Sequence, residues 1–247
     1  MSNQSLWNKD FLLDTGINFV VYLIYYLLMV IIAVVAKDQL HASLGEAGLA
    51  SGIFIVGTLL ARLQFGKAIE LYGRRMSLYG GIIFYFVTTL LYFYIPNLAI
   101  LYVIRFLNGM AYGIVSTATN TIVASCIPPE KRGQGINYYG LSTSLAAAVG
   151  PFLGMLLIVI TNFTFIITLC AVLVGLCMIG CIILHINEIE LTSEQIAKMK
   201  AMTLDNYVEY RVMVISIIGF FMGFAYSSVL TFLAAYAREI KDRKSVV

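Results

Sequence analysis

The ten residues GKAIELYGRR, at positions 66–75, form a polar break between two long apolar runs. Two glycines, Gly66 and Gly73, bracket the break, and glycine tolerates tight backbone turns better than any other residue. Glu70 lies between them among basic neighbours, and Arg74 and Arg75 follow directly. We therefore expect a short loop between antiparallel helices. Ion pairs would hold it, and it would dock on a neighbouring helix end and separate when the helices move.

The composition around this break is that of an integral membrane protein. Of the 247 residues, 60% are hydrophobic and 12% are charged, whereas about a quarter of the residues in soluble domains are charged. The same figures exclude disordered, collagen-like and disulfide-rich chains. The net charge of +3 gives no nucleic-acid footprint. The four cysteines lack the spacing of a metal or redox site.

Seven apolar runs are long enough to cross a bilayer, which takes about 20 residues. They cover residues 11–36, 47–65, 76–95, 98–124, 138–160, 163–184 and 212–236. Turn signals such as Pro96-Asn97 and Thr161-Asn162 separate neighbouring runs, and one long polar stretch, 186–211, precedes the last.

Basic residues concentrate in alternate loops, which orients the chain by the positive-inside rule. One set of loops holds nearly all of them, and the other set holds only Lys37 before the tail. We therefore expect a cytoplasmic N-terminus and a cytoplasmic linker at 186–211. The tail breaks the pattern, because it places Arg238, Lys241 and two further bases on the expected outer face.

Polar residues recur at spacings of three and four along the fourth run. Arg105, Asn108 and Tyr112 begin this stripe, and Ser116 and Thr119 continue it. These spacings place all five on one helical face. The stripe is either a water-filled pathway or an interhelical hydrogen-bond seam with a structural arginine.

The first run carries Asp14 and Asn18 at helical spacing, followed by several tyrosines. Asp14 is the only carboxylate near the first six runs, and it is either an interfacial acid or a functional one. The tyrosine-rich faces suit amphipathic organic cations, although such rings are also common at membrane interfaces.

Small residues predict tight helix packing. Glycine pairs at i and i+4 occur in four runs, and such pairs let helix backbones approach closely in lipid. The pairs are Gly48/Gly52, Gly109/Gly113, Gly150/Gly154 and Gly219/Gly223. Pro151 follows Gly150 in mid-run, where it removes a backbone hydrogen bond and favours a bend.

The loop at 66–75 resembles the signature loop of the major facilitator superfamily. Gly66, Gly73, Arg74 and Arg75 match that signature directly, and Glu70 stands where aspartate is usual. Three further segments resemble family motifs in the same order: Arg105 with Asn108-Gly109, the loop at 128–133, and Gly150-Pro151-Phe152-Leu153-Gly154. The last is typical of drug/proton antiporters, although Ala146 stands where that pattern has glycine.

The resemblance implies an all-α membrane protein built on part of a twelve-helix fold. Residues 1–185 would form a six-helix N-terminal bundle of two inverted three-helix repeats. A cytoplasmic linker at 186–211, a seventh transmembrane helix at 212–236 and a basic tail at 237–247 would follow. We expect a truncated chain whose foreign stretch starts near Lys241. Such a chain would pair with a separately encoded second half, form a homodimer or have no function.

The same resemblance implies roles for individual residues. Gly66, Glu70, Gly73, Arg74 and Arg75 would gate the cytoplasmic side. A coupling or substrate pathway would involve Asp14, Asn18, Arg105, Asn108 and Tyr112, with Asp14 as the candidate for proton exchange. Gly150, Pro151 and Gly154 would bend the fifth helix.

The expected function is therefore secondary active transport in the cell membrane, as proton-coupled export of small organic molecules or drugs by alternating access. The alternative is a non-transporting membrane fragment that lacks half of the transport cavity. No constellation of residues predicts an enzyme, a metal site or a cofactor. A retinal protein would need a lysine in the seventh run, which has none.

Overall fold

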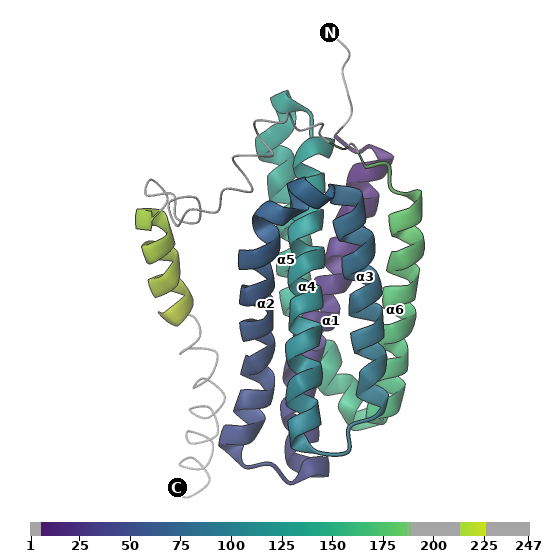
Figure 1. Cartoon of the computed structure of the whole chain (residues 1–247), viewed down its shortest axis with the longest axis vertical. Coiled ribbons are helices and arrows are strands. Elements are labelled where there is room, and N and C mark those ends of the chain that lie inside the picture. The colour runs from purple at the N-terminus through teal and green to yellow at the C-terminus, as the bar shows by residue number, and fades with distance from the viewer. Residues whose placement is uncertain (1–5, 187, 189–212, 226–247) are drawn as a thin grey trace, which may run out of the picture. The chain divides into compact units, whose positions relative to one another are not determined.

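The computed structural model describes residues 6–186, 188 and 213–225, except the side chains of residues 67, 68 and 70. Six long helices run side by side in the first part (Figure 1). They are α1 (Lys9–Leu40), α2 (Leu44–Tyr72), α3 (Arg74–Leu90), α4 (Leu98–Cys126), α5 (Arg132–Ile160) and α6 (Phe163–Ile183). Two short 3₁₀ turns, η1 (Leu91–Phe93) and η2 (Pro129–Lys131), lie between them.

Each of the six helices is long and apolar enough to cross a membrane. This confirms the first six predicted spans. A separate unit of the chain contains the shorter apolar helix Met213–Ala225. It falls within the predicted seventh span at 212–236, whose remaining residues lie outside the described ones, as do the tail at 237–247 and most of the linker at 186–211.

Polar residues at the turns define where several helices begin. Asn8, Asn97 and Asn162 each accept a hydrogen bond from a backbone N–H three residues later, at 2.7–2.9 Å. Ser43 and Glu46 form a capping box at the start of α2. These side chains satisfy N–H groups that have no partner inside the helix, so each turn stays short.

The loop at 66–75 differs from the prediction, because Gly66 does not begin a turn. α2 continues through it to Tyr72, and only Gly73 leaves helical geometry, with φ of +89°. The residues after Gly66 are mostly good helix formers, so nothing local stops the helix until the second glycine. The connection between α2 and α3 is therefore a single residue in a conformation that L side chains rarely adopt.

Helix contacts repeat in two related sets. The two most extensive join α2 to α4 and α1 to α5. Helices α1, α2 and α3 correspond to α4, α5 and α6 in this arrangement. Under that correspondence the α2–α4 contact is equivalent to the α5–α1 contact, and the α1–α4 and α3–α6 contacts are each equivalent to themselves. Because successive helices alternate in direction, α4 runs opposite to α1. The bundle thus consists of two inverted three-helix repeats, as predicted.

Glycines allow the two main contacts to close. A Cβ atom on Gly109 would overlap the Phe54 carbonyl oxygen of α2. A Cβ atom on Gly150 would lie 2.7 Å from Tyr26 Cβ of α1. Gly48 and Gly52, in contrast, have open space around them. Two of the predicted glycine pairs therefore lie at helix crossings within the six-helix unit, and the pair in α2 does not.

Candidate functional site

Arg105 is fully buried in α4 and is hydrogen-bonded on several sides. Its Nε donates to the Ala50 carbonyl at 3.0 Å and its Nη2 to the Ser51 carbonyl at 3.3 Å, both on α2. Its Nη1 donates to the Tyr92 hydroxyl at 3.4 Å. The guanidinium carbon also lies 4.5 Å from the centre of the Phe54 ring. The charge is thus solvated by backbone oxygens, a hydroxyl and an aromatic face.

Asn108 extends this network toward α3. Its amide nitrogen donates to the Thr88 hydroxyl at 3.0 Å, and its amide oxygen accepts from the Tyr92 hydroxyl at 3.5 Å. Asn108 and Arg105 therefore share Tyr92 and connect α2, α3 and α4. This geometry corresponds to the second arrangement that the sequence left open, an interhelical seam with a structural arginine. A role of these two residues in coupling stays a prediction.

Tyr112, the next residue of the stripe, belongs to a wall of aromatic rings instead. Its ring lies 5.3 Å from Tyr22, 5.0 Å from Tyr25 and 5.3 Å from Phe54, measured between centroids. Tyr112 is the fifteenth of the 29 residues of α4, so this wall lies near the middle of the helix. α1 contributes two of these rings, and α2 and α4 contribute one each.

The aromatic wall borders a pocket of about 310 Å³, which we call the tyrosine pocket. Eight residues of α1, α2 and α4 line it: Tyr22, Tyr25, Tyr26, Ile55, Thr58, Leu59, Arg62 and Tyr112. Cavities of this size accept small organic ligands. Tyr112, a residue of the predicted pathway, therefore lines a pocket of the six-helix unit.

The sequence did not identify Arg62 as a pocket residue. From the sequence, this arginine near the end of the second apolar run suggests an anchor at the membrane surface. In the structure its Nη2 donates to the Ser116 hydroxyl of α4 at 3.3 Å, and its side chain is exposed at the pocket. Arg62 lies four residues after Thr58 and therefore on the same helical face, and this spacing could have indicated that both residues line one pocket.

Asn18 forms a second polar junction on α1. Its amide nitrogen donates to the Ser142 hydroxyl of α5 at 3.2 Å, and its amide oxygen accepts from the Thr119 hydroxyl of α4 at 3.4 Å. Asn18 is buried, so these bonds fix α1 against both neighbours. Thr119, at the end of the predicted stripe, thus contacts the pathway residue of α1.

Asp14 is fully buried one helical turn before Asn18. Neither carboxylate oxygen has a hydrogen-bond partner among the described residues. The Tyr139 hydroxyl of α5, also buried, interacts electrostatically with this carboxylate. A charged carboxylate without partners is costly in such surroundings. A role of Asp14 in proton exchange stays a prediction.

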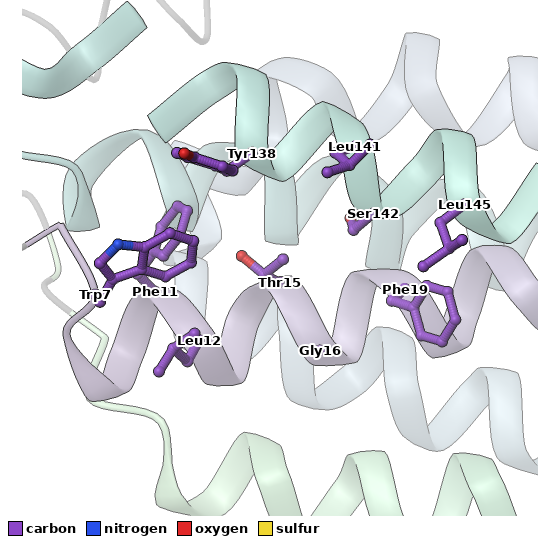
Figure 2. A pocket seen from close by; sticks show the side chains of 10 residues that line it. All are labelled: Trp7, Phe11, Leu12, Thr15, Gly16, Phe19, Tyr138, Leu141, Ser142 and Leu145. Carbon is purple, nitrogen blue, oxygen red and sulfur yellow. The ribbon is translucent and has the colours of Figure 1, made fainter. Parts of the chain in front are cut away.

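A second pocket, of about 370 Å³, opens between α1 and α5 near this acid. Figure 2 shows its lining, with Trp7, Phe11 and Phe19 on one side and Tyr138 and Leu145 on the other. Its walls are nearly all apolar. Its polar groups include the hydroxyls of Thr15 and Ser142, and Ser142 also accepts the bond from Asn18.

The backbone after Gly73 binds a carboxylate from the start of the linker. Glu188 accepts hydrogen bonds from the N–H groups of Arg74, at 2.9 Å, and Arg75, at 2.8 Å. These N–H groups form the positive end of α3, which has no cap from its own loop. The Arg74 side chain is buried, and the Arg75 guanidinium lies 5.8 Å from the Tyr79 ring centre. The side chain of Glu70 lies outside the described ones.

In α5, the segment with Pro151 faces α1. Gly150 and Gly154 bring the α5 backbone close to Leu23 and Leu27, with ideal Cβ positions 3.1 Å and 3.0 Å from the two carbonyl oxygens. The helix continues through Pro151 to Ile160. The two glycines are thus packing positions, and a bend at Pro151 stays a prediction.

These features together define a multi-pass membrane protein of two inverted three-helix repeats with buried polar networks between its helices. The chain belongs to the Major Facilitator Superfamily, whose family model matches residues 15–243. It is a member of a transporter family rather than an enzyme family.

The chain is similar to the multi-drug resistance efflux pump PmrA of Streptococcus pneumoniae, with 26% identity over 206 residues. The match covers 81% of this chain and 50% of that protein. An uncharacterized MFS-type transporter of Methanocaldococcus jannaschii is 24% identical over 62% of this chain and 37% of its own length. The chain thus spans half or less of the length of these relatives.

Solved structures of peptide transporters share the fold. One POT transporter, crystallised with alafosfalin, superimposes with a TM-score of 0.64 at 17% identity. The match covers 90% of this chain and 51% of that one. At this level of identity the likeness concerns the fold alone.

Proposed function

We propose that the protein takes part in secondary active export of small organic molecules across the cell membrane by alternating access. The tyrosine pocket carries this proposal, because it places aromatic rings, hydroxyls and one charged group near the middle of the bundle. Transporters of this architecture bind substrate near the membrane midplane, at the interface of their repeats. The relative named as a drug efflux pump, which this chain matches over 81% of its length, supports export.

We further propose that protons drive this export through Asp14. The support is its burial and the lack of a hydrogen-bond partner for either oxygen among the described residues. A carboxylate in this setting binds a proton when water is excluded and releases it when one side opens.

The loop after α2 is proposed as the cytoplasmic gate. The connection between α2 and α3 is the single residue Gly73, and Arg74 and Arg75 present basic groups beside it. Glu70, on the last turns of α2, is the proposed acidic partner. We propose that this gate and the N-terminus lie in the cytoplasm, and the concentration of basic residues in the loops expected on that side supports this orientation.

Alternating access needs a second wall for the tyrosine pocket. We propose that a second helical bundle provides it, as further residues of a longer protein, a separately encoded second half or a second copy of the chain. A membrane fragment that does not transport is the alternative function.

Inverted membrane vesicles containing the chain test the proposal. Uptake of ethidium, 2-naphthoate and a neutral coumarin is measured after acidification of the lumen, with and without nigericin to collapse the pH gradient. We expect gradient-dependent uptake of at least one probe, lost in Asp14→Asn and kept in Asp38→Asn, a carboxylate exposed at the far end of α1. Uptake equal to that of empty vesicles for all three would favour the non-transporting alternative. Uptake that ignores the gradient would refute proton coupling.

A further inference from the structure

The charge that lines the tyrosine pocket is positive. Among its lining residues Arg62 is the only charged one, and no carboxylate contributes to its wall. Asp14 is fully buried elsewhere on α1 and does not line the pocket. A cation entering the pocket would therefore meet a like charge without any compensating acid from the described part of the chain.

A second guanidinium lies behind the aromatic wall. Arg105 is within 4.5 Å of the Phe54 ring centre, and that ring in turn stacks on Tyr25 at 5.0 Å. Arg105 has no carboxylate among its described hydrogen-bond partners, which are carbonyl and hydroxyl oxygens. Its positive charge is thus not neutralised, and in a medium of low dielectric it adds to the potential at the pocket.

Ring faces of Tyr25, Tyr112 and Phe54 that could attract a cation are already engaged. Tyr25 stacks on both Phe54 and Tyr112, with interplanar angles of 19° and 30°. The Phe54 ring faces Arg105. An aromatic cage for a cation needs free ring faces around the charge. In this pocket the rings contact one another instead, which leaves their hydroxyls and edges for a ligand.

Arg62, in contrast with Arg105, has donors to spare. A guanidinium carries five N–H groups, and the described structure gives this one a single hydrogen bond, to Ser116. Its side chain is exposed at the pocket, so a planar acceptor can reach two parallel N–H groups. A carboxylate is the acceptor whose geometry fits that fork best.

We propose that the tyrosine pocket binds organic anions: molecules with an apolar or aromatic body and a carboxylate or similar acidic group that pairs with Arg62. The tyrosines contact the body and offer hydroxyls to its polar atoms. This inference rests on the proposed function, because it names the substrate class of the same site. It departs from the organic cations that the tyrosine-rich faces suggest from sequence alone.

Two fluorescent probes of equal body and opposite charge test the charge preference. Binding of 2-naphthoate and of 2-naphthylmethylammonium to the full chain in detergent is measured by equilibrium dialysis. We expect naphthoate to bind about tenfold more tightly or better, the factor that one charge-assisted hydrogen bond contributes. Arg62→Gln should remove this preference, and Arg62→Lys should retain part of it. Lys37→Gln, at an exposed lysine at the end of α1, should leave it unchanged.

Several results would overturn the anion proposal. These are equal or tighter binding of the ammonium probe, an unchanged naphthoate affinity in Arg62→Gln, or no binding of either probe above that of empty micelles. Thermal unfolding of each variant shows whether the fold is intact, and Arg62→Lys tests the charge if Arg62→Gln unfolds. The vesicle assay separates the two proposals. Export of ethidium but not naphthoate refutes the anion class and keeps transport. Binding of naphthoate without uptake of any probe keeps the pocket and refutes transport.

Discussion

Replacing Gly109 by alanine should force α2 and α4 apart. The new Cβ atom would overlap the Phe54 carbonyl oxygen and would lie 2.8 Å from its carbonyl carbon and 3.0 Å from its Cα. All three are backbone atoms inside a helix, so none can rotate away as a side chain would. The Thr58 hydroxyl also donates to the Gly109 carbonyl at 3.0 Å, and separating the helices would break this bond.

The magnitude follows from three contributions. Overpacking a close contact costs about 1–3 kcal/mol, and the lost hydrogen bond costs about 1 kcal/mol. Alanine is the better helix former and returns about 1 kcal/mol. The free energy of unfolding of Gly109→Ala should therefore fall by about 1–3 kcal/mol.

Gly52→Ala is the matched control. It introduces the same methyl group in mid-helix, but the ideal Cβ position at Gly52 has nothing within 4 Å. This variant should gain only the helix propensity, about 1 kcal/mol. The difference between the two variants, about 2–4 kcal/mol, is then the steric and hydrogen-bond cost alone.

Thermal unfolding in detergent with a thiol-reactive fluorescent dye measures this difference, because Cys170, Cys177 and Cys181 are buried in the folded bundle. For a chain of this size each kcal/mol shifts the midpoint by about 2–4 °C. Gly109→Ala should unfold several degrees below Gly52→Ala. Equal midpoints would refute the close crossing of α2 and α4.

Three further outcomes follow from the same contacts. Asn108→Leu should lower the free energy of unfolding by about 1–3 kcal/mol, because it removes the bond to Thr88 from the seam; an unchanged midpoint in the dye assay would contradict this. Glu188→Gln should weaken the cap of α3 by about 0.3–1 kcal/mol and speed hydrogen exchange at the Arg74 amide, whereas an unchanged rate would exclude the contact. Cys126, the one half-buried cysteine, should react with a small maleimide before the three buried ones, and Cys126→Ala should abolish that fast phase.

The six spans were predictable because their signals are local. A bilayer-length apolar run and a capping residue such as Asn97 or Asn162 are both readable within one segment. The inverted repeats were predicted from the resemblance to family motifs and not from periodicity, because no local pattern in the sequence indicates that α2 packs on α4. The glycine pairs indicated that close crossings exist but did not say which pairs form them.

At residues 66–75 the prediction that Gly66 begins a turn was wrong. Glycine permits a turn but does not impose one, and most of the six residues after Gly66 are good helix formers. Only Gly73 has the positive φ that requires glycine. The partner of this loop was beyond sequence reasoning, because Glu188 lies 114 residues from Arg74.

Two arginines inside the apolar helices, Arg105 and Arg62, illustrate why the site could be only half predicted. Arg105 and Arg62 are the same residue type in similar apolar helices, yet one is sealed in a seam and the other opens on a pocket. Two of the hydrogen-bond partners of Arg105 are the backbone carbonyls of Ala50 and Ser51, which would be present with any side chain at those positions. The exposure of Arg62 depends on how α2 is rotated against α4, and glycine contacts at the crossing set that rotation. An arginine in a membrane helix therefore marks a functional or structural site from sequence alone, and only the packing of its neighbours decides which.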